Sequence, residues 1–143
     1  MSILIYAEYA EGKFKKAAFE LASYAKKVAE SLGTTVTAVT INAGDVSELS
    51  KYGVDKVLKV NNDELSGFTA KAYADVIKQA AQKENIKLLL LSSTTDSVYL
   101  SSLVAVALEA GYASNVVGLP VSTSPFQVKR TAFSNKAFMI TEI

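Results

Sequence analysis

The chain has 143 residues, half of them hydrophobic and a fifth charged, which suits one globular domain that needs no disulfide or metal to fold. Lysine and arginine number 15 against 14 acidic residues, so no charge excess points to nucleic acid as a partner. Cysteine and histidine are absent, which excludes disulfides, thiolate catalysis, the usual zinc sites and serine–histidine triads within these residues.

The sequence shows no targeting or membrane-spanning pattern. Its first residues, MSILIYAEYAEGKFKK, lack the basic region and long apolar core of a secretory signal. The longest apolar runs, such as residues 103–108, fall far short of the roughly 20 residues that span a bilayer. We therefore expect no membrane insertion, and a location in the cytoplasm or, in a eukaryote, in the mitochondrial matrix.

The first part of the chain alternates between strand and helix patterns. Residues 2–7 form an apolar run typical of a buried strand, and a turn-rich loop around Gly12 follows. Apolar residues at steps of three and four predict a helix over 15–32, and Gly33 can end it in a left-handed conformation. The β-branched residues of 34–41 predict a second strand.

A compact segment, SELSKYGVDKVLKVNND, spans residues 47–63. Asp45 or Ser47 can cap a short helix that reaches Lys51, and Gly53 follows it. The alternation in KVLKV predicts a strand over 56–60. The segment holds no nucleophile and no phosphate-binding glycine string, so its residues alone indicate scaffold.

The next part repeats the alternation. Thr69 begins a helix whose apolar positions between 70 and 81 keep the helical period. Residues 87–93 are apolar on both faces, which is typical of a central parallel strand. A helix over about 99–109, ended by Gly111, and a fifth strand in SNVVGLP complete this part.

The order of these elements predicts the fold class. Strands alternating with helices imply an α/β fold with a mainly parallel sheet and right-handed crossovers. Two alternating runs around Ser134 and Asn135 predict a C-terminal β-hairpin. No internal repeat or linker appears, so we expect a single domain.

A nucleotide site is the first functional hypothesis for such a sheet, because α/β sheets bind ligands beyond the carboxyl ends of their strands. The glycines do not support it, since neither a dinucleotide nor a P-loop pattern occurs. The hydroxyl-rich segment SSTTDS, residues 92–97, precedes a helix where an anion can sit. Capping of that helix is the simpler explanation.

Paired carboxylates occur only as Glu8 with Glu11 and as Asp63 with Glu64. Both pairs lie in segments that we expect to be exposed loops. Nothing nearby in the sequence promises the burial that would tune a pKa for acid–base work. We therefore expect these carboxylates to be solvated.

The helix VYLSSLVAVALEA is unusual, because Glu109 is its only charge. A helix that is apolar nearly all round is buried on more than one side. Either the sheet and a neighbouring helix cover it, or a partner does, and the residues leave both possibilities open.

Four segments, taken in order, resemble the alpha subunit of the electron-transfer flavoproteins. They are ILIYAEYAEGKFKKAAFELASYAKKVA, ELSKYGVDKVLKVNND, FTAKAYADVIKQAAQKENIKLLLLSSTTDS and VKRTAFSNKAFMITEI. The second is the most specific, and together they cover essentially the whole chain. The resemblance identifies residues 1–143 as a single N-terminal domain of such a subunit.

The resemblance implies a Rossmann-like three-layer sandwich, related to universal stress proteins and nucleotide hydrolases. In that family FAD lies mainly in a separate C-terminal domain, and the N-terminal domain packs with the beta subunit. Nothing here resembles the glycine-rich FAD-binding segments, so the resemblance implies a chain without that domain, without a cofactor and without catalytic residues. Its implied role is scaffold and subunit contact.

The intact heterodimer implied by this resemblance carries electrons through FAD. It would take them from flavoprotein dehydrogenases, such as the acyl-CoA dehydrogenases of fatty acid β-oxidation. It would pass them to a quinone oxidoreductase or another acceptor.

The sequence departs from the family around the apolar helix, where family arginines and other polar residues are replaced. These replacements favour a hydrophobic contact with the partner. The resemblance and the departures together predict an interface that includes Val98, Leu103, Ala107, Arg130, Phe133 and Asn135.

Two rival functions come from other classes. One is an adenine-nucleotide-binding module similar to universal stress proteins, for which ATP or AMP binding by this chain alone would be the evidence. The other is a small hydrolase, which the lack of histidine, cysteine and a nucleophile elbow disfavours.

Overall fold

The computed structural model describes residues 2–86, 88–92, 94–108, 122–123, 126–132 and 137–142, and its account of side chains ends at residue 108. A sheet of four parallel strands runs in the order β5-β4-β1-β6. Its strands are β1 (Ser2–Tyr6), β4 (Thr35–Ile41), β5 (Lys56–Val60) and β6 (Leu88–Leu90), and the helices are α1 (Lys16–Leu32), α2 (Ala70–Lys83) and α3 (Thr95–Ala107).

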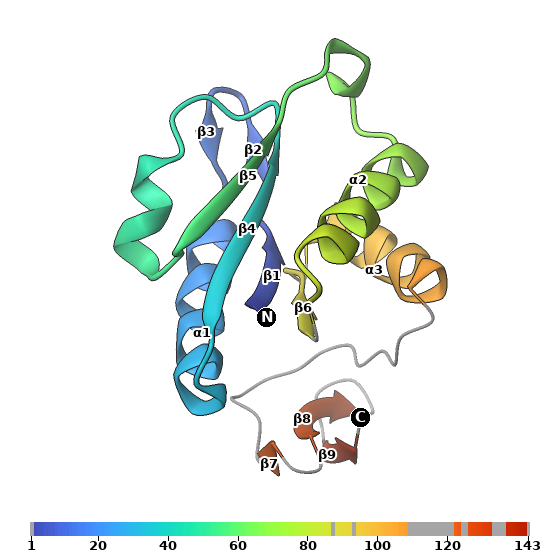
Figure 1. The fold of residues 1–143 in the computed structure, drawn as a ribbon. Helices are drawn as coiled ribbons and strands as arrows, with labels where there is room; N and C mark the ends of the chain where they lie inside the picture. The colour runs from blue at the N-terminus through green and yellow to red at the C-terminus, as the bar shows by residue number, and fades with distance from the viewer. Residues whose placement is uncertain are drawn as a thin grey trace.

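Helices cover both faces of this sheet, with α1 on one side and α2 and α3 on the other (Figure 1). Because successive side chains of a strand point to opposite faces, Ile3 and Ile5 of β1 pack toward α1. Leu4 and Tyr6 pack toward α2 and α3. The predicted α/β class, three layers with a mainly parallel sheet, is confirmed.

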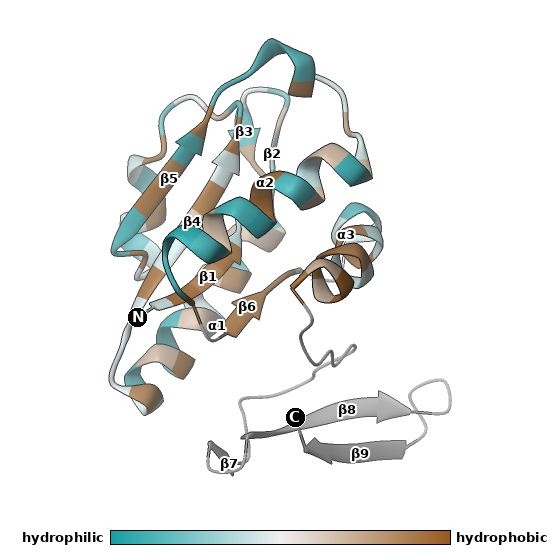
Figure 2. Cartoon of the chain, turned by 45° about the vertical axis from the view of Figure 1, so that its right-hand side comes forward, coloured by the Kyte–Doolittle hydropathy of each residue, from teal (hydrophilic) through white to brown (hydrophobic). Residues whose placement is uncertain are grey.

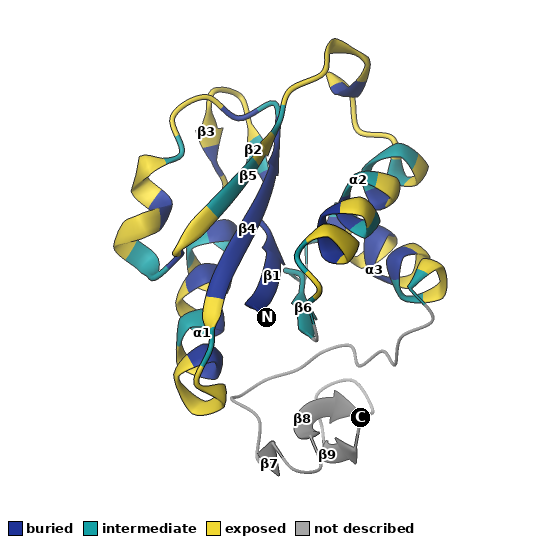
Figure 3. Cartoon of the chain, in the orientation of Figure 1, coloured by how far each residue is buried: buried dark blue, intermediate teal, exposed yellow. Residues whose placement is uncertain are grey.

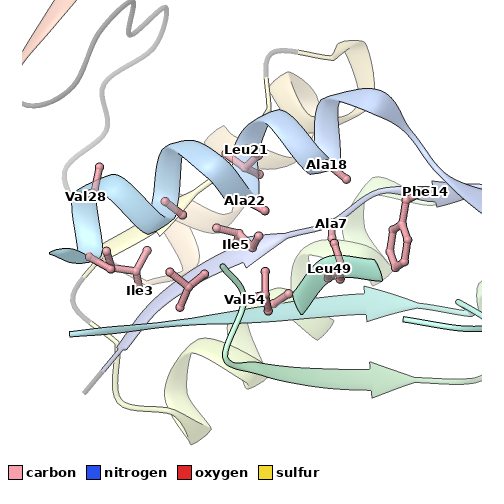
Figure 4. Packing of buried hydrophobic residues seen from close by; sticks show 14 of the residues in the cluster. Ile3, Ile5, Ala7, Phe14, Ala18, Leu21, Ala22, Val28, Leu49 and Val54 are labelled. Atoms are coloured by element: carbon pink, nitrogen blue, oxygen red, sulfur yellow. The ribbon is translucent and has the colours of Figure 1, made fainter. Parts of the chain in front are cut away.

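The core beneath α1 explains why this helix lies close to the sheet. Small side chains on its inner face, Ala18, Ala22 and Ala25, are fully buried over β1 and β4. Ile3 and Ile5 of β1 pack beneath this face of the helix, between α1 and the sheet (Figure 4). β1 and β4 are the best-buried elements (Figure 3). Burying each of their large aliphatic side chains contributes about 1.5–3 kcal/mol to the stability of the fold.

The segment that follows β4 forms a 3₁₀ helix, η1 (Ser47–Tyr52). Val46 is its N-cap residue and makes no side-chain cap hydrogen bond, while the carboxylate of the preceding Asp45 accepts a hydrogen bond from the Ser47 N–H at 2.9 Å. Gly53 ends η1 with φ 95°, in the left-handed region that favours glycine. A Cβ at Gly53 would lie only 2.6 Å from Cγ of Lys26, so the Lys26 stem packs directly over this glycine.

Three elements differ from the prediction. The loop around Gly12 contains two short antiparallel strands, β2 (Tyr9–Ala10) and β3 (Lys13–Phe14). The helix α3 begins at Thr95 instead of residue 99, because the Thr94 hydroxyl caps it by accepting from the Ser97 N–H. The strand β6 covers only Leu88–Leu90 and pairs, among the described strands, with β1 alone.

The C-terminal part of the chain contributes β7 (Ser122–Thr123), β8 (Phe126–Ala132) and β9 (Ala137–Glu142), which pair antiparallel in the order β7-β8-β9. Residues 133–136 between β8 and β9 lie outside the described residues, so the hairpin stays a prediction. The predicted strand in SNVVGLP also falls outside the described part. In the described ranges, no helix combines the length and apolar character needed to cross a bilayer.

Candidate functional site

The strand order places the switch point of the sheet at β1. The chain leaves β1 through α1 to reach β4 on one side, and it returns through α2 to β6 on the other side. In open α/β sheets, ligands bind beyond the carboxyl ends of the strands where the order reverses in this way. A ligand site in this sheet is therefore expected among the residues that follow β1 and β6.

A buried carboxylate, that of Glu8, lies at this point. Its side chain is only 4% exposed, although it follows β1 by two residues. The hydroxyls of Thr94 and Ser97, at the start of α3, donate hydrogen bonds to Oε1. The Lys15 ammonium lies 2.9 Å from Oε2. The prediction that Glu8 is a solvated loop residue is wrong, because segments far away in sequence cover it.

The short hairpin β2–β3 explains how Lys15 reaches Glu8. Tyr9 pairs with Phe14 and Ala10 with Lys13, so the next residues outward, Glu8 and Lys15, face each other. The Lys15 N–H donates to the Glu8 carbonyl oxygen at 3.0 Å, which extends the pairing. Positive φ angles of 55° and 80° in the turn residues Glu11 and Gly12 are those that a two-residue hairpin requires.

Burial and hydrogen bonding act in opposite directions on Glu8. Burial favours the neutral acid and is the largest single influence on its pKa. Hydrogen bonds from Ser97, Thr94 and Lys15 outweigh it together, and the pKa of Glu8 is lowered. The hydrogen bond to Glu8 raises the pKa of Lys15. Burial likewise raises the pKa of the neighbouring Tyr6.

These contacts give Glu8 a structural role. Its carboxylate accepts from three side chains, is only 4% exposed, and ties the end of β1 to the β2–β3 hairpin and to the start of α3. The capping role predicted for residues 92–97 is confirmed by Thr94. The anion near this helix start is the chain's own Glu8, which local sequence patterns could not show.

An open, polar depression of about 670 Å³ lies next to this cluster, beyond the carboxyl ends of β4 and β5. Glu11 and Asp63 contribute negative charge to it, and none of its described lining residues is basic. Asn42 is not free to bind, because its side chain exchanges two hydrogen bonds with the Asn62 backbone, at 2.9 and 2.7 Å. The lining therefore disfavours phosphate groups.

No metal centre is indicated in the part of the chain that the structure describes. Nowhere in it do three or more acidic side chains gather closely enough to hold an ion. Asp63 and Glu64, the second predicted carboxylate pair, both lie in exposed positions, as expected.

Against the other residues that the structure describes, the apolar helix α3 buries one side. Leu100 and Val104 pack in the cluster under α2, together with the small polar side chains Ser97 and Ser101. The outward side carries an apolar surface, here called the α3 face, and Figure 2 shows the helix as largely hydrophobic. Its apolar residues are Val98, Tyr99, Leu103, Val106 and Ala107, of which Val106 is 79% and Tyr99 68% exposed, and the small polar residue Ser102 is exposed among them.

The predicted interface residues separate into two groups. Val98, Leu103 and Ala107 all lie on the α3 face. Arg130 belongs to β8, whose side chains are not described, and Phe133 and Asn135 fall outside the described residues. Of the two possibilities raised for the apolar helix, cover by the sheet and α2 is confirmed for one side of α3 only. Described residues leave the other side uncovered, so cover by a partner stays a prediction.

The sequence of this chain is similar to those of known proteins. Residues 3–143 match a family model described as the electron transfer flavoprotein domain. An electron transfer flavoprotein subunit alpha of Thermoanaerobacterium thermosaccharolyticum is 32% identical over 123 residues, which cover 83% of this chain and 37% of that protein. Protein FixB of Clostridium saccharobutylicum is 29% identical over 83% of this chain and 36% of its own length.

A third relative carries a different name. The acryloyl-CoA reductase electron transfer subunit beta of Anaerotignum propionicum is 27% identical over 87% of this chain and 35% of its own length. The chain thus spans little more than a third of the length of these relatives.

Proposed function

Because the chain belongs to the electron transfer flavoprotein family, we propose that residues 1–143 act as the scaffold and subunit-contact domain of such a protein. Its relatives are named as electron transfer subunits, which supports a role in electron transfer. The partner proposed here is the beta subunit of an electron transfer flavoprotein.

The α3 face is the observation that carries this proposal. It exposes Val98, Tyr99, Leu103 and Val106 side by side on one helix, and no charged residue interrupts it between residues 97 and 107. Apolar surface of this kind is typical of contacts between subunits. An exposed aromatic residue such as Tyr99 is the residue type that most often anchors such contacts.

The described residues do not fit FAD. A dinucleotide needs backbone amides or cations for its phosphates, but Glu8 already occupies the start of α3 and the adjacent depression carries Glu11 and Asp63. We therefore assign no flavin contact to them. In our proposal the FAD of the intact protein is held elsewhere and the domain itself is no enzyme.

The proposal extends to the whole assembly. Its electrons would come from flavoprotein dehydrogenases, such as those of fatty acid β-oxidation, and go to a quinone oxidoreductase or another acceptor, with the assembly in the cytoplasm. The relatives' names, which include an acryloyl-CoA reductase and a lactate dehydrogenase subunit, support a range of redox partners.

A charge on the α3 face tests the contact. We expect the Leu103→Glu variant to bind an electron transfer flavoprotein beta subunit at least tenfold more weakly than the wild type, because a carboxylate would lose its water at the interface. Isothermal titration calorimetry measures the affinity. Gln82→Glu, at an exposed position of the neighbouring α2, is the control and should bind normally. Unchanged binding by Leu103→Glu would refute the proposed surface.

The alternative function, an adenine-nucleotide-binding module, rests on the position of the polar depression beyond the strands. Its acidic lining and the filled switch point weigh against it. Equilibrium dialysis with AMP and ATP separates the two functions. Micromolar binding by this chain alone would favour the nucleotide module.

A further inference from the structure

We propose that the Glu8 carboxylate is a built-in substitute for an anionic ligand and closes the switch-point crevice of this domain to phosphate-bearing molecules. The crevice meant here is the position beyond the carboxyl ends of β1 and β6 where sheets of this topology bind ligands, which the contacts among Glu8, Lys15, Thr94 and Ser97 fill. This proposal concerns ligand access and does not depend on the partner contact proposed for the α3 face.

The first support is position. The switch point between β1 and β6 is where a sheet of this topology receives ligands. Glu8 follows β1, and its hydrogen-bond partners Thr94 and Ser97 follow β6, at 86 and 89 residues' separation. The chain's own carboxylate therefore connects the two segments between which a ligand would lie.

The second support is the chemistry of the surrounding groups. An ammonium group and two hydroxyls that converge on one carboxylate are also donors that suit a phosphate oxygen. Here Lys15, Thr94 and Ser97 all donate to Glu8, and only 4% of the Glu8 side chain is exposed. An incoming anion would have to displace a carboxylate that is covalently fixed in place, and so present at very high effective concentration.

The third support is the charge around the crevice. Asp96 of α3 and Glu11 of the β2–β3 turn both lie near enough to Lys15 to affect its pKa. Tyr6 of β1 and Tyr73 of α2 are the other titratable groups nearby, and burial raises the pKa of each. Lys15 pairs with Glu8 and lies within electrostatic reach of two further carboxylates, so an additional anion would meet repulsion as long as Glu8 is in place.

Chemical rescue tests the proposal. Glu8→Ala removes the carboxylate and leaves a space about the size of acetate, with its donors intact. We expect acetate to raise the melting temperature of this variant, and an excess of about ten times the dissociation constant would shift its folding equilibrium on the order of tenfold. Inorganic phosphate serves as a second probe, with chloride at equal ionic strength as the reference.

Two variants act as controls. Glu8→Gln keeps the volume of the side chain, and Glu30→Ala removes an exposed carboxylate at the far end of α1. Neither should respond to acetate beyond the wild-type response. An equal response of all variants, or no response of a folded Glu8→Ala, would overturn the proposal.

A measurement on the wild type keeps the proposal testable if Glu8→Ala does not fold. Inorganic phosphate, AMP and ATP are titrated into the labelled wild-type chain, and the backbone amide signals of residues 94–97 are followed by NMR. We expect no saturable shift. A saturable shift at millimolar concentration or below would show that the crevice is open and that the proposal is wrong.

Discussion

At position 8, a residue in a loop is buried and yet ionised. Removing one partner of a buried, charged hydrogen bond costs about 1.5–3 kcal/mol, and Glu8 accepts from three groups on different segments. The carboxylate thus ties the end of β1 to the start of α3 and to the β2–β3 hairpin. The stability that these contacts contribute therefore depends on the protonation state of Glu8.

The dependence on that proton has a definite sign. The pKa of Glu8 is lower in the folded chain than its ordinary value of 4.5. Its contribution is therefore complete above about pH 4.5 and is lost as the pH falls through the folded pKa. We expect Glu8→Gln to be less stable than the wild type by about 1–3 kcal/mol at pH 7.

This difference should narrow as the pH falls below about 4.5 and through the lowered pKa of Glu8, because the wild type loses its charged carboxylate there and the variant has none to lose. Urea unfolding at a series of pH values measures it. Glu30→Gln, at an exposed site, should follow the wild-type curve at both ends. A gap between Glu8→Gln and the wild type that stays constant over the whole acid range in which the wild type remains folded would contradict the assignment.

Between elements, the contact of η1 with α1 depends on Gly53. This residue has φ 95°, and a Cβ there would lie 2.6–2.8 Å from the Lys26 Cβ, Cγ and Cδ atoms. We expect Gly53→Ala to lower the free energy of unfolding by about 2–3 kcal/mol, since the left-handed backbone and the overlap both cost energy. Chemical denaturation measures the loss.

A second glycine, Gly33, separates the cost of the left-handed backbone from the cost of the steric overlap. Gly33 ends α1 with φ 65°, but a Cβ there would meet no atom within 4 Å. Gly33→Ala should therefore cost only the backbone strain, about 1 kcal/mol. If both variants lost the same free energy, the packing of Lys26 over Gly53 would have no role in joining these elements.

Local patterns predicted the elements whose cause is local. The spacing of Ala18, Ala22 and Ala25 predicts the inner face of α1, and Gly33 ends it as expected. The start of α3 differs from the prediction, because Thr94 caps its first turn and that turn buries Ser97 where the hydrophobic pattern requires an apolar residue.

At the scale of the whole molecule, the sequence did not predict the cluster around Glu8, because its contacts depend on the fold. Nothing near Glu8 in the sequence indicates burial, because its cover comes from Thr94 and Ser97, which lie 86 and 89 residues away in the sequence and follow the neighbouring strand β6. The parallel topology brings these segments together, and only the fold reveals it. The family resemblance, by contrast, was carried by scaffold segments such as residues 48–63 and is confirmed by the match over residues 3–143.

The same topology predicts an uneven stability across the domain. β1 and β4 are buried on both faces, whereas the described part of the chain covers α3 on one side and leaves Val106 79% exposed. Local opening is easiest where few apolar contacts are lost. We expect the amides of α3 to exchange with solvent deuterium at least tenfold faster than those of β4, as measured by hydrogen exchange with mass spectrometry.

Partner binding should reduce the difference in amide exchange rate between α3 and β4. If the beta subunit covers the α3 face, exchange in α3 should slow on complex formation while that of β4 stays the same. The Leu103→Glu variant provides the control, because its α3 should keep exchanging fast in the presence of the partner. Slow exchange of α3 in the free chain would show that the helix is already covered on both sides, and the proposed contact would then need another surface.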